Sequence, residues 1–219
     1  TAVHEAYEDT SNVIIAFRDL ASAKYAKHVF DHTKASGYPA DMRVVSFRAV
    51  SWSDDGNAIF FGIKERDRKP PKAQPVVASA GAGDATQMKS SQDSAARKAA
   101  AEEPAGVEVW HSKDVDIIPT QKVRANFDRN FNYLAAWHLP GDRFVQLGDE
   151  VTEDVILTKG QKFAVGRDGT PYDRTRMFSF EYKDYYAIDV ATGQRKKVRD
   201  KVLTDFGFSF PTSATGRYA

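Results

Sequence analysis

The sequence predicts an all-β chain, a β-propeller fragment of about three four-stranded antiparallel blades with one long flexible insertion. Two observations carry this prediction. Ser51 and Trp52 are joined to an apolar segment, 58–63, through a turn that contains Asp55 and Gly56, and Asp-Gly most readily supplies the positive φ angles of a tight hairpin. Segment 58–63 is apolar at nearly every position, which is typical of a strand covered on both faces. Such a strand belongs inside a stack of sheets.

The other strands follow from similar patterns. Pro140-Gly141-Asp142 predicts a hairpin between 133–139 and 143–147, and Lys159-Gly160 predicts another before 163–167. A third hairpin of the repeat is expected at 210–216, after Phe206, Phe208 and Phe210 have placed three rings on one face of a strand. Segment 24–32 fits either a short helix or an outer strand, and 168–183 is expected to be a long loop. The remaining predicted strands are 12–17, 107–110, 154–158, 185–190 and 195–198.

These elements divide the chain into consecutive parts. Residues 1–43 are predicted to form the outer strands of a preceding blade or a lead-in, 44–153 one blade, 154–203 the next, and 204–219 the start of a further, truncated blade. Because Thr1 is not an initiator methionine and Ala219 falls inside an expected strand, we expect a piece of a longer protein.

A low-complexity insertion at 66–106 interrupts the first complete blade. It is rich in Ala, Ser, Lys and Pro, and none of the aromatic residues of the chain lies in it. Such a stretch cannot bury enough surface to offset the entropy of ordering it. We predict a flexible surface loop with a short helix at 94–103; a lid or a docking tail is the alternative interpretation.

Composition excludes several classes of function. The 219 residues carry 31 basic and 30 acidic side chains, a net charge of +1, so no overall field recruits nucleic acid or an anionic membrane. The chain has no cysteine, which rules out disulfides, thiol catalysis and cysteine-bound zinc. No apolar run approaches the roughly 20 residues of a membrane span. We expect no nucleic-acid partner and no membrane partner.

A search for catalytic motifs finds none. The chain lacks a Gly-x-Ser-x-Gly elbow, a His-Glu-x-x-His pair and a phosphate-binding loop, and Gly81-Ala82-Gly83 lacks the third glycine of a dinucleotide site. His28 and His32 would share one face of a helix, but isolated surface histidines are favoured because no third ligand is near. His111 and His138 each follow a tryptophan and fit a pocket or the core. We predict no catalytic residue, no metal site and no cofactor.

Charged clusters allow two interpretations each. The basic segment 195–201 would be a phosphate contact in a nucleic-acid binder, but charges that protect an outer strand from aggregation are favoured. Asp54 and Asp55 are more typical of turn residues that bond local amides than of a catalytic pair. Polar residues beside Phe127 and Phe131 either line a pocket or form a salt-bridged loop; they are Arg124, Asp128, Arg129 and Asn130.

Segment 50–56 together with 59–63 is similar to the repeat of TolB-like propellers and of the propeller in prolyl oligopeptidase family peptidases, with Trp52, Asp55 and Gly56 as the repeat motif. Three further segments, 109–121, 128–131 and 185–193, resemble the N-terminal part of large bacterial serine peptidases of that family. The resemblance covers about residues 30–219 without the insertion. The chain departs from it where Lys159-Gly160 lacks the Asp and where 212–216 lacks Ser-Pro-Asp-Gly.

The resemblance implies a propeller that covers an α/β-hydrolase domain and restricts entry to short peptides. The triad would follow this chain, so the resemblance assigns no catalytic residue to it and leaves the substrate-binding residues unknown. It also implies a periplasmic or secreted protein, with a peptide substrate and a C-terminal hydrolase domain as partners. An unpaired sheet edge in a truncated propeller predicts aggregation or a homo-oligomer.

Two other functions fit the same sequence. A TolB-like propeller without an enzyme would be a protein-binding scaffold. A propeller glycosidase would use inward carboxylates such as Asp168 or Asp184, and it needs two carboxyl groups about 5 to 10 Å apart across a pocket.

Overall fold

The computed structural model of the chain describes residues 9–20, 25–67, 111, 114–176, 180–204 and 213. Most of the predicted insertion lies outside these ranges, together with the helix expected at 94–103, the strand expected at 107–110 and Gly81-Ala82-Gly83. The predicted strand with Phe206, Phe208 and Phe210, and nearly all of the hairpin expected at 210–216, also lie outside the described residues.

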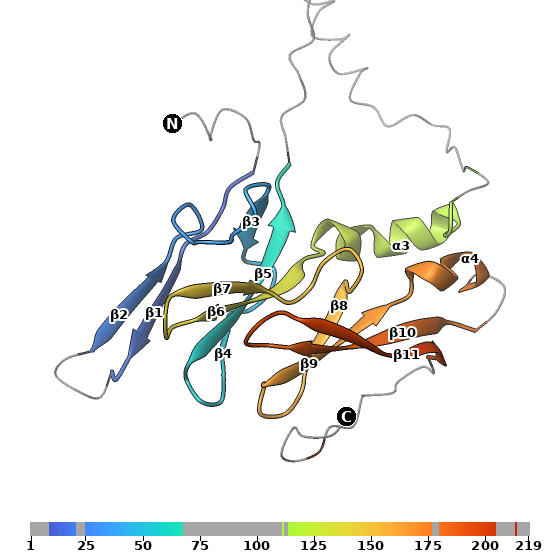
Figure 1. Ribbon diagram of the computed structural model, residues 1–219. Coiled ribbons are helices and arrows are strands. Elements are labelled where there is room, and N and C mark those ends of the chain that lie inside the picture. Colours follow the sequence, from blue (N-terminus) through green and yellow to red (C-terminus); the bar gives the residue numbers. More distant parts are fainter. Residues whose placement is uncertain are drawn as a thin grey trace, which may run out of the picture.

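Antiparallel strands form three sheets in the described chain (Figure 1). The N-terminal hairpin consists of β1 (Ile14–Arg18) and β2 (Ala26–Phe30). The central sheet consists of β3 (Met42–Val45), β4 (Ser51–Trp52), β5 (Ala58–Glu65), β6 (Tyr133–His138) and β7 (Arg143–Gln146). The C-terminal sheet consists of β8 (Asp154–Leu157), β9 (Phe163–Asp168), β10 (Tyr182–Asp189) and β11 (Arg195–Leu203).

Both larger sheets follow the chain in simple order. In the central sheet, β3 and β4 pair with the two halves of β5, with Val45 opposite Gly62 and Trp52 opposite Ile59. They therefore occupy one strand position, and the sheet has four such positions. The C-terminal sheet runs β11-β10-β9-β8. No described sheet closes into a barrel, so the chain is an all-β, propeller-like fragment, as the sequence predicts.

Strand β5 is buried on both of its faces. Ile59, Phe61 and Ile63 pack in one core with the N-terminal hairpin, where Phe30 lies 5.2 Å from Phe61 between ring centroids. Ala58 and Phe60 point the other way, into a second core shared with the C-terminal sheet. Side chains of successive strand residues alternate between faces, so a strand between two layers must be apolar throughout. The continuous apolar run is explained by this position.

Two polar contacts join the central sheet to the C-terminal sheet near the turn between β10 and β11. The imidazole Nε2 of His138 lies 3.0 Å from the carbonyl oxygen of Val190. Asp149, in the connection after β7, forms an ion pair with Arg195 at the start of β11. His138, which was predicted to lie in a pocket or in the core, is therefore half-buried between the two sheets.

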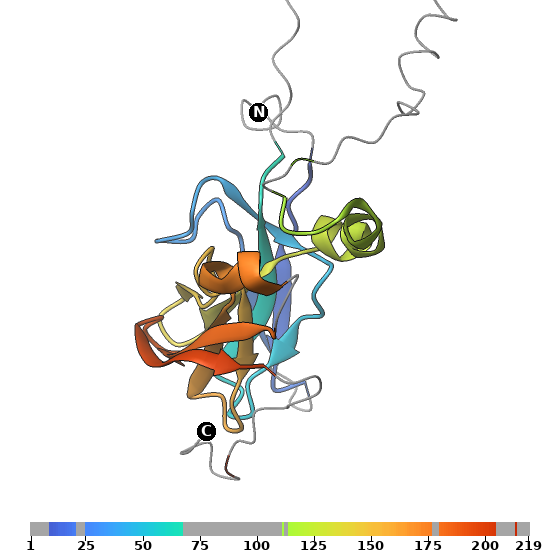
Figure 2. The same ribbon diagram turned by 90° about the vertical axis from the view of Figure 1, so that its right-hand side faces the viewer.

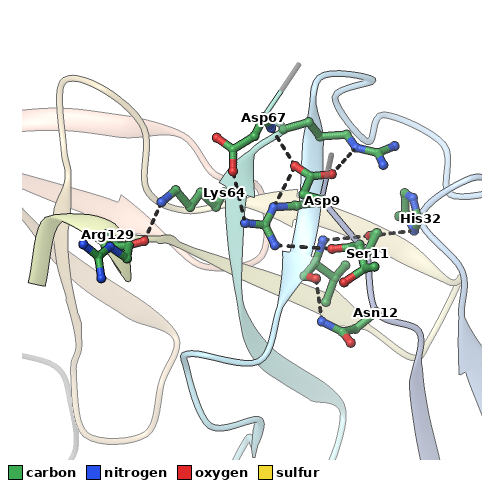
Figure 3. Close-up of polar contacts among 11 residues, drawn as sticks. Asp9, Ser11, Asn12, His32, Lys64, Asp67 and Arg129 are labelled. Atoms are coloured by element: carbon green, nitrogen blue, oxygen red, sulfur yellow. Dashed lines mark hydrogen bonds and ion pairs between the residues drawn. The ribbon is translucent and has the colours of Figure 1, made fainter. Parts of the chain in front are cut away.

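A buried carboxylate anchors the segment before β1 (Figure 3). Asp9, whose side chain is 5% exposed, lies 3.0 Å from Nε of Arg43 and 3.2 Å from Nε of Arg66. It also accepts the backbone N–H of Asp67 at 2.6 Å. Arg43 lies in β3 and Asp67 follows β5. The carboxylate of Asp9 therefore links the segment before β1 to β3 and to the end of β5.

The short helices lie in the connections between strands. They are α3 (Ile118–Arg129) before β6, and η1 (Thr170–Tyr172) with α4 (Asp173–Arg176) before β10. The predicted loop 168–183 thus contains helical turns. The segment around Arg124, for which a pocket or a salt-bridged loop was predicted, is a helix, which the sequence analysis missed. Figures 1 and 2 agree in placing α3 and α4 at the same end of the stacked sheets.

The ambiguous segment 24–32 is resolved as a strand. Residues 26–30 form β2, and Ala16 of β1 lies opposite His28. The helix that would have aligned His28 with His32 is therefore wrong. A strand is favoured here because Phe30 reaches the core while Lys27 and Val29 stay exposed, the alternation of a sheet with one covered face.

Candidate functional site

A pocket of about 530 Å³ opens between α3 and the upper ends of β8, β9 and β10. Connections from both larger sheets build it, because β5–β6 and β9–β10 leave their sheets at the same end (Figure 1). Its lining contains four aromatic residues, namely Phe127 of α3, Phe131 after that helix, Tyr172 of η1 and Tyr182 of β10. Among the described residues that line it there is no histidine, serine or cysteine.

Negative charge dominates this lining, and we call the site the acidic pocket. Its three basic residues are each held by an acidic neighbour. Arg124 lies 2.9 Å from Asp116, Lys183 lies 2.9 Å from Glu181, and Arg167 pairs with Asp154. The remaining acidic residues of the lining are Glu153, Asp168 and Asp173. A site with more carboxylates than basic groups attracts a cationic ligand.

Helix α3 carries Arg124 to the pocket without burying any of its own residues. Pro119 stands in the first turn, where its missing N–H costs nothing. Arg124 bridges Asp116, before the helix, and Asp128, one turn later at 3.8 Å. The sequence predicted either a pocket lining or a salt-bridged loop for this segment. Arg124 does both in part, since it lines the pocket and also forms ion pairs. Asp128 and Arg129 are not among the lining residues.

Glu153 carries the perturbed carboxyl group of the pocket. Its pKa is raised above the ordinary value of 4.5, first because protein atoms displace part of the surrounding water and then because Asp173 and Asp168 repel its charge. The guanidinium of Arg124 acts in the opposite direction. A bound cation would relieve this repulsion, so the electrostatics of Glu153 favour a positively charged ligand.

Asp168 and Asp184 lie opposite each other on β9 and β10. Asp168, 7% exposed, lines the pocket and accepts the backbone N–H of Thr170 at 3.0 Å. Asp184, 2% exposed, is not in the lining. It accepts the hydroxyl of Tyr172 at 2.7 Å and the backbone N–H of Lys201 at 2.9 Å, and it pairs with Lys197.

These contacts decide the role of Asp184. Burial alone would raise its pKa, but the hydrogen bonds from Lys197, Lys201 and Tyr172 outweigh burial and hold the pKa below 3.8. A catalytic acid needs a raised pKa and access to substrate. Asp184 has neither, so we assign it to the support of β10, β11 and η1. Of the two carboxylates named for a glycosidase, Asp168 lines the pocket and Asp184 does not.

The predicted repeat motif lies at the opposite end of β5 from the pocket. Asp55 accepts the hydroxyl of Ser53 at 2.6 Å and the backbone N–H of Asn57 at 3.0 Å. The Ser53 bond is the main reason that the pKa of Asp55 falls to about 2. Gly56 has a φ of +66°, as its turn requires. Trp52 is 40% exposed beside this hairpin. The three residues shape the turn and touch no part of the acidic pocket.

The remaining histidines stand apart from the pocket. Nδ1 of His32 lies 3.3 Å from Oγ of Ser11 (Figure 3), and burial lowers the pKa of His32 below 6.5. Oγ of Ser11 also accepts the backbone N–H of Val44, which makes it a structural hydroxyl. His28 faces the ring of Trp137 at 6.5 Å, and His111 lies next to Asp114, whose carboxylate accepts its backbone N–H.

Within the described ranges, no three His, Asp or Glu side chains are arranged to hold a metal ion. Among the same residues, no helix is long and apolar enough to span a bilayer. Comparisons of the chain with protein-family models, with curated proteins and with solved structures return no match.

Most residues of the acidic pocket were not predicted. The sequence singled out Arg124, Phe127, Phe131 and Asp168, and the structure brings all four into one lining. Glu153, Tyr172 and Lys183 carry no local signal, because their importance comes from the packing of two sheets. The clustering of acidic residues just before β8 and at its first residue, at 149–154, is the one feature that could have drawn attention to this region.

Proposed function

We propose that this chain is the non-catalytic, substrate-gating β-propeller part of a serine peptidase related to the prolyl oligopeptidase family. In this proposal the catalytic α/β-hydrolase domain belongs to the same polypeptide and lies beyond residue 219. The chain admits short peptides and excludes folded proteins, since a rigid stack of sheets leaves only narrow openings. A periplasmic or secreted location belongs to the same proposal.

The stacked four-position sheets support the propeller part of this proposal. Each begins with a tight hairpin at the same place, β4–β5 in the central sheet and β8–β9 in the C-terminal sheet. The resemblance of segment 50–63 to the repeat of this peptidase family supports the assignment to a peptidase.

The acidic pocket is the observation that carries the peptide-binding part. A short peptide offers an ammonium group at its N-terminus, and Glu153 and Asp168 offer carboxylates in a lining with excess negative charge. The rings of Phe127 and Tyr182 can pack against the first side chains of the peptide. Peptide binding without hydrolysis is therefore the expected activity of the 219-residue chain.

The test is a titration of the purified chain into a short peptide labelled at its C-terminus, followed by fluorescence anisotropy. A peptide with a free N-terminus should bind, and its N-acetylated form should bind about tenfold more weakly or worse, because one charge interaction in a partly desolvated site is worth about 1.4 kcal/mol or more. Mass spectrometry of the same mixtures should find the peptide intact.

Two variants sharpen the test. Glu153→Gln should lower the affinity for the peptide with a free N-terminus and leave the affinity for the acetylated peptide unchanged. Asp200→Asn, which removes an exposed carboxylate on β11, should change neither affinity. Equal affinity for the two peptides would refute the ammonium site. Cleavage by the isolated chain would refute the non-catalytic assignment.

The exposed surface of α3 favours a second candidate, a TolB-like propeller that acts as a protein-binding scaffold. Val123 is 83% exposed and Phe127 is 65% exposed, one turn apart on the same helix face. This apolar face suits a protein contact, either with a hydrolase domain or with a separate partner. Assay of the complete polypeptide with a proline-linked chromogenic peptide separates the two, because only the gate of a peptidase accompanies hydrolysis.

A further inference from the structure

Strand β11 is a long, basic and exposed edge. Among the described residues it is the outermost strand of the C-terminal sheet. Seven of its nine residues are exposed, and only Arg195 and Val202 are half-buried. Five of its residues are basic and one, Asp200, is acidic. An edge strand presents unpaired backbone N–H and C=O groups along its open side. The edge therefore combines a hydrogen-bonding template with a strong positive charge.

Four of the five basic residues of β11 fall into two groups by face. Arg195 and Lys197 lie opposite Ile188 and Tyr186 and are held by carboxylates of the protein itself, Asp149 and Asp184. Lys196 and Arg199 lie opposite Ala187 and Tyr185, which places them on the other face of the sheet. In the part of the chain that the structure describes, neither Lys196 nor Arg199 has an acidic partner.

Among the described residues, carboxylates neutralise the first group and none neutralises the second. Protection against aggregation explains why an edge is charged. The same charges repel a basic strand and discourage a neutral one, but they attract an acidic one. Val198 and Leu203, 59% and 50% exposed, add apolar contacts for a strand laid along the edge.

We propose that β11 binds an extended acidic segment of a partner polypeptide, which adds a strand to the C-terminal sheet. Backbone hydrogen bonds to the open edge provide the affinity. Lys196 and Arg199 provide the selection for Glu and Asp. This interaction is independent of the acidic pocket, which attracts the opposite charge and lies at the connections between strands.

A protein strand is favoured over a nucleic acid. The chain as a whole carries a net charge of only +1, which is far from the basic surface of nucleic-acid binders. Lys196 and Arg199, which have no acidic partner among the described residues, lie on one face of β11. An extended peptide along this edge can meet both these charges and the open N–H and C=O groups of the strand.

The probe is an acetylated and amidated peptide of about eight residues that alternates Glu and Val, a typical strand length. We expect it to bind the 219-residue chain and to slow hydrogen exchange of the backbone amides of β11. The double variant Lys196→Glu/Arg199→Glu should lose about tenfold or more in affinity. Lys27→Glu/Lys34→Glu makes the same change of charge on exposed residues elsewhere and should lose much less.

A second peptide separates strand addition from charge attraction alone. Its sequence is identical, but alternate backbone nitrogens are methylated, which blocks pairing along a strand and keeps every carboxylate. Loss of binding supports the proposal. Equal binding of the methylated peptide, full competition by a single-stranded oligonucleotide of equal charge, or no binding of the parent peptide would each overturn it. Because both peptides are N-acetylated, failure of the ammonium site in the acidic pocket would not affect this result.

Discussion

The side-chain oxygen of Gln161 accepts a hydrogen bond of 2.8 Å from the backbone N–H of Asp54. Asp54 lies in the hairpin between β4 and β5, and Gln161 lies in the hairpin between β8 and β9. The two turns occupy equivalent places in neighbouring sheets, and each contains a glycine with positive φ, Gly56 at +66° and Gly160 at +79°. Neighbouring units of the stack therefore touch through the same turn, which is the arrangement that a repeat predicts.

The first hairpin is shaped by backbone conformation more than by packing. A Cβ atom at Gly56 would meet nothing within 4 Å, so Gly56→Ala tests the positive φ alone. We expect a loss of about 1 to 2 kcal/mol in the free energy of unfolding, the usual cost of a left-handed conformation for a residue with a Cβ. Urea denaturation followed by tryptophan fluorescence measures it.

Gly62→Ala is the contrasting variant. A Cβ there would lie 2.6 Å from Oδ1 of Asn132 and 2.9 Å from Cβ of Arg48, and Nε of Arg48 donates to that same Asn132 oxygen at 2.7 Å. We expect a larger loss than at Gly56, because the substitution separates two hydrogen-bonded side chains. Equal losses at the two glycines would contradict this account of β5.

Asp184→Ala should destabilise the C-terminal sheet. It removes the acceptor for Tyr172, Lys197 and the backbone N–H of Lys201, and an unsatisfied buried donor costs about 1 to 3 kcal/mol. Lys196→Ala, on the exposed face of β11, should stay within about 0.5 kcal/mol of the parent protein. Similar losses for both variants would show that Asp184 is not a structural support.

The pH dependence of the free energy of unfolding also tests the role of the Asp184 carboxylate. Since its folded-state pKa lies below 3.8, the unfolded chain binds the proton first as the pH falls. The stability that Asp184 contributes is therefore complete above this value and is lost as the pH falls through the lower folded-state pKa. Asp184→Asn should flatten this part of an acid denaturation curve.

How much of this was predictable depends on whether the signal is local. The apolar run in β5 and the Asp-Gly turn fix their own conformations, so the sheet position of 58–63 and its hairpin were predicted correctly. Helix α3 was missed because none of its residues is buried, and an unburied helix shows no amphipathic period. The acidic pocket brings Arg124 of the β5–β6 connection to Asp168 at the end of β9, and the distance between them in sequence hides that packing.

Affinity for a peptide ammonium should depend on the ionisation of Glu153. Its raised pKa means that it takes up a proton at a higher pH than an ordinary glutamate, so affinity should fall as the pH decreases through that raised value. Burial is the main reason that this pKa is raised; Asp173 and Asp168, which face the same pocket, raise it further, and Arg124 lowers it. Anisotropy titrations between about pH 7 and pH 4 should show this fall in the parent chain. A much flatter profile is expected for Glu153→Gln, and identical profiles would exclude Glu153 as the titrating group.

The most direct test of the stacked-sheet architecture compares two neighbouring residues of β5. Phe60 and Phe61 are 1% and 0% exposed, and they enter different cores on opposite faces of the strand. Phe60→Ala and Phe61→Ala should each lower the free energy of unfolding by about 3 to 5 kcal/mol. A large loss at one position and a loss below about 1 kcal/mol at the other would show that β5 has a solvent-exposed face, and the propeller-like stack would be wrong.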